Sequence, residues 1–218
     1  MILKRNFNPA KVVSYVWQEL LIALLMAAIA FVLFKNEWIK LHIPFSVAAI
    51  LGSALAIFIA FRNNNSYSRW WEARTIWGGI INNSRIVARQ VIANADNAVA
   101  TGKATEEKVQ AYKKEMIYRQ AAFAHALRLH LRRQDSWEEL NHLLTKKEFE
   151  TFLTTQNKPN FLLLQQGIRI KEAMREEILG PFDNISMEPN LASFNNWQGS
   201  CERIKNTPLL RQYHFFTK

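Results

Sequence analysis

The chain has 218 residues, a formal net charge of +10 and a single cysteine, Cys201. One cysteine excludes an internal disulfide, and the few glycines and prolines argue against a low-complexity or fibrous protein. The basic balance suits an anionic partner such as the headgroup layer of a membrane, a nucleic acid or a small anion. The composition is divided, because residues 12–61 are strongly apolar whereas residues 62–218 are polar and charged. A nucleic-acid-binding protein has no need of the first part.

Two apolar runs in residues 12–61 predict a pair of membrane spans. The first span covers about residues 12–34, although its uncharged core, Leu20 to Phe34, is short for a bilayer and needs the residues before it. The second covers about residues 41–61 and has no formal charge when His42 is neutral. A cleaved signal peptide is the competing interpretation of the first run. The second run follows so closely that a helical hairpin is favoured.

Basic residues flank the hairpin on both sides and predict its orientation. The N-terminal segment, residues 1–11, contains no acidic residue, and arginines follow the second span. The positive-inside rule therefore places both ends in the cytosol. We expect a multi-pass protein of the inner or plasma membrane with a cytosolic N-terminus. The basic residues that carry this prediction are Lys4, Arg5, Lys11, Arg62, Arg69 and Arg74.

Residues 62–208 are predicted to form a cytosolic helical domain. An apolar stripe from Ile76 to Val87 keeps helical spacing beyond the polar run Asn63–Ser66, so the second membrane helix is expected to continue into this domain. The next break is expected within Asn94–Thr105. The predicted fold class is all-α, a membrane hairpin whose second helix enters a cytosolic bundle. Further helices are predicted over Glu106–Arg133, Phe161–Leu179 and about Asn190–Ile204. Another helix is predicted to begin after Thr145, which with Glu148 would form a capping box.

No motif for catalysis, metal binding or phosphate binding is recognisable in the sequence. His125 and His130 are five residues apart, which does not give the i, i+4 spacing of two ligands on one helix face. Acid pairs such as Glu138-Glu139 fit a solvated surface. We therefore expect neither an enzyme nor a bound metal or other cofactor.

The second membrane helix carries an apolar stripe. Ser53, Ile57 and Phe61 recur every four residues and share one helix face. Spacing alone favours packing of this stripe against lipid or against the first span. The small residues Gly52 and Ala56 would allow a neighbouring helix to approach closely.

A second group of residues follows where this helix leaves the membrane. Arg69 and Glu72 are three residues apart and can form an ion pair, and Trp70 shares a face with Trp77. We interpret the group as a structural clamp, a packed helix interface with satisfied charges. The alternative is a rigid, preorganised base below a pore. The residues of this clamp are Arg69, Trp70, Trp71, Glu72, Arg74 and Trp77.

The segment Phe61–Gly78, FRNNNSYSRWWEARTIWG, closely resembles the signature of the bestrophin family in its bacterial branch. The resemblance extends upstream through ILGSALAIFIAF and downstream through LRLHLRRQD to GSCERIKNTP at Gly199–Pro208, so it covers nearly the whole chain. It implies a homopentameric ion channel in which each subunit contributes its second membrane helix to a central pore. The expected partners are the lipid bilayer, the other subunits, and chloride or other small monovalent ions. No nucleic acid is expected.

The resemblance also assigns two constrictions to positions of this chain. The apolar neck of the family matches Ser53, Ile57 and Phe61, and ungapped counting from GSCERI places the cytosolic aperture at Phe182. Rings of Ile57 and Phe61 can exclude water and close a pore by dewetting. Ser53 departs from the family, which usually has an apolar residue there. Its hydroxyl is expected to make the outer neck easier to wet.

The chain departs from the family pattern at its C-terminus. Residues 209–218 are expected to be the start of a second membrane region, in which the family continues and this chain stops. The segment that forms the calcium site of animal members has no counterpart, so no calcium dependence is inferred. Three hypotheses stay open: a channel subunit, a non-conducting truncated channel, and a membrane-anchored helical scaffold. A nucleic-acid-binding domain on a membrane hairpin rests on charge alone.

Overall fold

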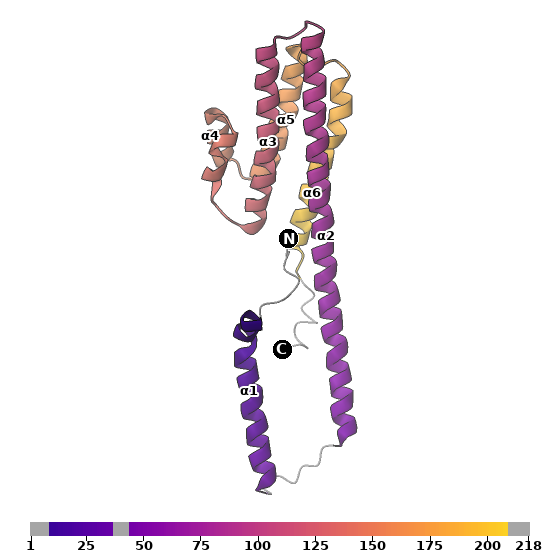
Figure 1. Cartoon of the computed structure of the whole chain (residues 1–218), viewed down its shortest axis with the longest axis vertical. Coiled ribbons are helices and arrows are strands. Elements are labelled where there is room, and N and C mark those ends of the chain that lie inside the picture. Colours follow the sequence, from indigo (N-terminus) through magenta and orange to yellow (C-terminus); the bar gives the residue numbers. More distant parts are fainter. Residues whose placement is uncertain (1–8, 37–43, 209–218) are drawn as a thin grey trace. The chain divides into compact units, whose positions relative to one another are not determined.

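The computed structural model describes residues 9–36 and 44–208. Every regular element in these ranges is a helix, which confirms the predicted all-α class. The chain divides into two units, Met1–Ala56 and Ile57–Lys218. In chain order the elements are α1 (Pro9–Lys35), α2 (Phe45–Ala100), α3 (Glu106–Arg132), the 3-10 helix η1 (Trp137–Leu143), α4 (Lys146–Thr154), α5 (Lys158–Arg175) and α6 (Asp183–Asn206) (Figure 1).

Parts of the predicted domain boundaries lie outside the described residues. These are most of the N-terminal segment, the link between the spans with the first residues of the second span, and the whole of 209–218. Within the described residues, α1 contains the predicted first span, and α2 begins at Phe45, directly after Pro44. Both helices are long and apolar enough to cross a bilayer.

The helix α2 runs without interruption for 56 residues. The polar run Asn63–Ser66 is therefore helical, and the predicted continuation into the second unit is confirmed. Ser66 shows how the run is accommodated, because its hydroxyl donates to the carbonyl oxygen of Arg62 at 3.0 Å. Further along, Ile80 and Val91 are buried in the second unit. Apolar burial thus holds the part of α2 that follows its polar stretch.

The second unit is a bundle of the later part of α2 with α3, α5 and α6. Around the bundle, α2 lies beside α3, α3 beside α5, α5 beside α6, and α6 beside α2 (Figure 1). Phe123 of α3 and Phe194 of α6 meet in the centre with ring centroids 5.4 Å apart. Tyr112, Leu127 and Leu162 are also fully buried. This core holds the later part of α2, from Ile76 onward, within the bundle.

A chain of hydrogen bonds crosses the core. The amide of Gln166 on α5 donates to the side-chain oxygen of Gln120 on α3 at 2.9 Å. Gln120 in turn donates to the hydroxyl oxygen of Ser84 on α2 at 2.8 Å, and Ser84 donates to the carbonyl oxygen of Ile80. Buried polar groups are costly unless they are paired, so this chain favours one register of the three helices.

The predicted boundaries of α5 were wrong at both ends. The helix begins at Lys158 rather than Phe161, because Asn157 caps it by accepting a hydrogen bond from the amide of Asn160 at 3.2 Å. Pro159 lies in the first turn, where its missing N–H costs nothing. The helix ends at Arg175, before the predicted Leu179.

The early end of α5 has a packing cause. Glu177 has a φ of 58°, in the left-handed region, and reverses the chain. The amide of Ile178 then donates back to the carbonyl oxygen of Ala173 at 2.9 Å. The reversal buries Ile178 and Leu179 in the core, which a continued helix would not do.

Two further predictions need correction. The last helix begins at Asp183 rather than Asn190 and contains Pro189. Gln90 of α2 supports this early stretch by donating to the carbonyl oxygen of Ser186 at 3.0 Å. The predicted capping box is half formed: Thr145 accepts from the amide of Glu148 at 3.3 Å, but the carboxylate of Glu148 binds Arg119 instead.

Arg119 is buried and is the centre of a network of partly buried ion pairs. Its guanidinium donates to Glu148 at 2.5 Å and to Glu115 at 2.6 Å, and Arg169 also donates to Glu115 at 2.9 Å. Burial by itself raises the pKa of Glu115, but the hydrogen bonds from the two arginines outweigh it and lower that pKa. The network joins α3 to α4 and α5.

The helices α2 and α6 cross closely at Gly79. A Cβ atom at this position would lie 2.6 Å from Cζ2 of Trp197 on α6, far inside van der Waals contact. The neighbouring Gly78 has no such atom within 4 Å. Gly79 is therefore required by the crossing, and Gly78 is not.

We predict that Gly79→Ala lowers the free energy of unfolding by about 1–3 kcal/mol, because the added methyl must displace the Trp197 ring. Gly78→Ala is the matched control and should raise stability by up to about 1 kcal/mol, since alanine favours the helix. Thermal unfolding in detergent measures both. A Gly79→Ala protein at least as stable as Gly78→Ala would contradict the close crossing.

We also predict a loss of stability in acid that depends on Glu115. Its pKa is lower in the folded state, so the stabilisation is present above the unfolded-state pKa, about 4.3, and is lost as the pH falls through the folded-state pKa. Glu115→Gln should be less stable at neutral pH and should lose less stability on acidification. Denaturant midpoints of the wild type and of Glu115→Gln are measured between about pH 6 and pH 3. Equal losses of stability in the two proteins on acidification would contradict the role of Glu115.

Candidate functional site

The three predicted neck residues all lie in α2. Ile57 and Phe61 belong to the second unit, are one helical turn apart and expose about half of their surfaces. Ser53 belongs to the first unit and is also exposed. Large apolar side chains at the surface of one chain need lipid or another subunit to cover them.

Ser53 uses its hydroxyl within its own helix. Its Oγ donates to the carbonyl oxygen of Ala49 at 2.8 Å. A hydroxyl committed in this way keeps acceptor lone pairs but has no proton left to donate. In this rotamer the position can bind water as an acceptor, and it offers nothing to an anion.

The clamp residues Arg69 and Glu72 do not form the predicted pair with each other. Arg69 instead donates to the carbonyl oxygen of Thr207, just beyond the end of α6. Glu72 accepts from the guanidinium of Arg203, in the last turn of α6, at 2.6 Å. A guanidinium near a helix C-terminus is favoured by the exposed carbonyl groups there. Both residues therefore tie α2 to the end of α6.

The tryptophans of the clamp have different environments. Trp77 is partly buried and packs against the core of the bundle. Trp70 and Trp71 are exposed and form an aromatic cluster with Tyr67, whose ring centroid is 5.8 Å from that of Trp70. Arg74 lies over Trp70 with its Cζ 5.7 Å from the ring centroid, within cation–π range. The clamp thus has a packed end at Trp77 and an open aromatic end.

Phe182, the predicted aperture residue, lies immediately before α6 and is 77% exposed. The turn that presents it is held by Asp183, whose carboxylate accepts from the amide of Gly180 at 2.6 Å. Ile185, one turn later in the chain, is also exposed. Sequence reasoning missed Asp183, which holds this turn without capping α6, and the exposed Ile185.

The remaining candidates for chemistry are poorly suited to it. Cys201 is buried, and burial raises the pKa of its thiol to about 11, which keeps it protonated. Burial and the nearby Lys205 lower the pKa of His130, so its imidazole is neutral at physiological pH. Within residues 9–36 and 44–208, no cluster of three metal-ligating side chains occurs.

Comparisons with known proteins give the family. The family described as "Bacterial/Fungal Bestrophin protein" matches residues 6–218. A "Voltage-dependent anion channel-forming protein" of Ralstonia nicotianae is 33% identical over 79% of this chain and 54% of its own length. The protein YneE of Escherichia coli K12, with the same description, is 33% identical over 82% of this chain and 56% of its own. The chain therefore spans about half the length of these curated relatives.

A solved structure agrees with these relatives. The crystal structure of a bacterial bestrophin homolog from Klebsiella pneumoniae is 28% identical, with a TM-score of 0.79 over 93% of this chain and 71% of that chain. Two helices apolar enough to cross a bilayer and the match to this family identify a membrane protein. On this evidence the chain belongs to the bacterial and fungal bestrophin family.

Proposed function

We propose that this chain is the pore-forming part of a homopentameric channel for passive flow of chloride or other small monovalent ions across the cell membrane. The observation that carries the proposal is α2, an unbroken 56-residue helix with exposed apolar residues before a packed bundle. The description of its relatives as anion channel-forming proteins supports the same function. One helix cannot enclose a pore, so the mechanism requires several copies.

The gate in this proposal is a neck formed by Ser53, Ile57 and Phe61. In a pentamer, five copies of Ile57 and Phe61 form two apolar rings one helical turn apart. Water leaves a narrow apolar constriction, so ions cannot pass until small movements widen or rewet the rings. The ring of Ser53 hydroxyls wets the outer end of the neck without offering donors to an anion.

The charge of the chain favours anions outside the neck. A formal net charge of +10 on each subunit raises the local anion concentration at a cytosolic mouth. We propose Phe182 as a second constriction in this region, because it is exposed on a turn held by the carboxylate of Asp183. The proposal places the N-terminus in the cytosol and both apolar helices across the membrane.

A membrane-anchored scaffold is the second candidate function. The observation that favours it is the exposed cluster of Tyr67, Trp70 and Trp71, since aromatic side chains are enriched where proteins bind partners. Chemical cross-linking in membranes separates the two functions. A ladder that ends at five subunits supports the channel, whereas a monomer joined to another protein supports the scaffold.

We predict that Ile57→Ala and Phe61→Ala each increase chloride flux from liposomes by several-fold. Smaller side chains widen the rings and make them easier to wet. Ile59→Ala is the control, because Ile59 is also exposed but lies on another face of α2. Equal chloride fluxes in all three variants would show that Ile57 and Phe61 do not form the gate. Absence of flux from well-inserted wild-type protein would reject the channel itself.

A charge reversal tests the tie between α2 and α6. Glu72→Arg places a third guanidinium beside Arg69 and Arg203 and should destabilise the protein. Adding Arg203→Glu should recover the lost stability. The pair is surface-exposed, so a double-mutant cycle should give a coupling of about 0.2–1 kcal/mol. Glu150→Arg on α4 serves as the control. Additive effects of the two reversals would show that the pair contributes nothing.

A further inference from the structure

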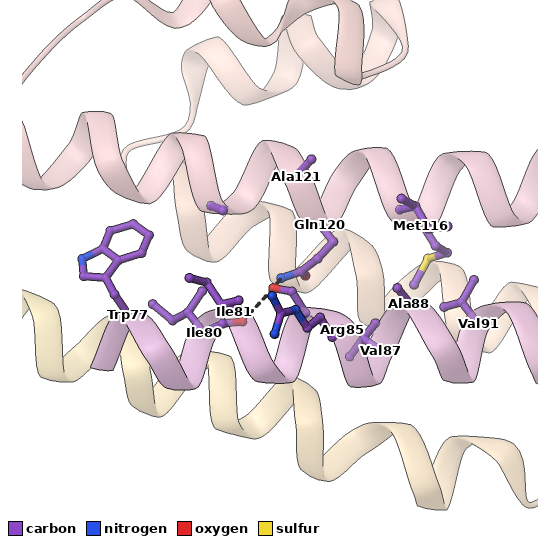
Figure 2. Close-up of a pocket in the computed structure, with 13 residues that line it drawn as sticks. Trp77, Ile80, Ile81, Arg85, Val87, Ala88, Val91, Met116, Gln120 and Ala121 are labelled. Atoms are coloured by element: carbon purple, nitrogen blue, oxygen red, sulfur yellow. Dashed lines mark hydrogen bonds between the residues drawn. The ribbon is translucent and has the colours of Figure 1, made fainter. Parts of the chain in front are cut away.

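An apolar groove lies between α2 and α3 in the second unit. It encloses about 350 Å³. Figure 2 shows Ile80, Ile81 and Val91 of α2 on one side of it, and Met116 and Ala121 of α3 on the other. Ala88, Ala121 and Ala124 line it with short side chains and so keep it open. Such a hollow, on the surface of a folded bundle, can receive large apolar side chains from another molecule.

A second apolar groove lies between α5 and α6. It encloses about 470 Å³ and is lined by Leu163, Gly167 and Leu191. Two large side chains on its α5 wall protrude from the surface: Leu164 is 59% exposed and Ile168 is 42% exposed. They are four residues apart and share one helix face. We call these two residues the α5 stripe.

The two grooves lie on opposite sides of the same bundle. The α2–α3 side is fixed by the hydrogen bond from Gln120 to Ser84. The α5–α6 side is fixed by the hydrogen bond from Gln198 of α6 to Asn157, the N-cap of α5, at 3.0 Å. Since α3 borders α5 and α6 borders α2, each groove is separated from the other by the width of the bundle.

A ring of identical subunits needs two different surfaces that fit each other, one on each side of the subunit. We propose that the α5 stripe of one copy of this chain packs into the α2–α3 groove of the next copy. The occupant of the groove is thus a second copy of this chain. The inference rests on the homopentamer of the proposed function and names the surfaces through which its cytosolic parts associate.

The charges at the two grooves are compatible with this contact. Arg85 lines the α2–α3 groove, and Glu188 and Lys171 line the α5–α6 groove. In the described part of the chain, no ion pair involves Arg85 or Glu188. The proposed packing brings the guanidinium of one copy toward the carboxylate of the next. Docking in one direction only is thereby favoured, since two α2–α3 grooves would bring arginines together.

Cysteine cross-linking tests the contact directly. Cys201 is the only cysteine of the chain and is replaced by serine to give a thiol-free background. Ala121→Cys marks the α2–α3 groove and Leu164→Cys marks the α5 stripe. Membranes that contain each single variant, the double variant, and the control A121C/E138C are treated with a short bifunctional thiol reagent. An amine-reactive reagent, applied to parallel samples, reports whether the oligomer is present.

The proposal predicts a covalent ladder that extends beyond dimers for A121C/L164C alone, because only a head-to-tail contact links successive copies. Dimers from either single variant would mean that like surfaces meet, and would overturn it. An amine-linked pentamer without a thiol ladder would overturn this interface and leave the proposed pentamer intact. Monomers with both reagents would reject the pentamer and the interface together.

Discussion

The constraint on which the rest of the structure depends is the continuity of α2 from Phe45 to Ala100. Within the second unit, the bundle holds the later part of this helix. It does so at three levels, through the close crossing at Gly79, the hydrogen bond at Ser84 and the ties of Arg69 and Glu72 to the end of α6. The proposed gate therefore belongs to a helix whose base is packed rather than free.

The division between covered and uncovered apolar surface supports a membrane assembly. In the second unit, burial of α2 begins at Ile76 and is complete at Ile80, Val87 and Val91. The apolar residues of α1 and of the start of α2 are exposed in the single chain. Lipid can cover part of that surface, and further copies of α2 can cover the stripe that contains Ile57 and Phe61. The two grooves of the bundle offer surfaces for the same assembly outside the bilayer.

The sequence predicted the elements that depend on local patterns. The helical spacing of the apolar stripe from Ile76 to Val87 predicted the continuity of α2 through Asn63–Ser66, and Thr145 marked the start of α4. Long-range pairings were not predictable. Arg69 and Glu72 have partners more than a hundred residues away in the chain, whereas helical spacing suggested only each other. The end of α5 was missed because burial of Ile178 and Leu179 overrides helix propensity. The neck positions followed from resemblance, since pore-lining and lipid-facing stripes have the same period.

The most direct measurement of the central claim is the current through a planar bilayer that contains the purified chain, under a potassium chloride gradient. The account predicts discrete currents that need no energy source and reverse close to the equilibrium potential of chloride. A reversal close to the potassium potential would contradict anion selectivity. A membrane with inserted protein and no current above the lipid background would contradict the claim that this chain forms a pore.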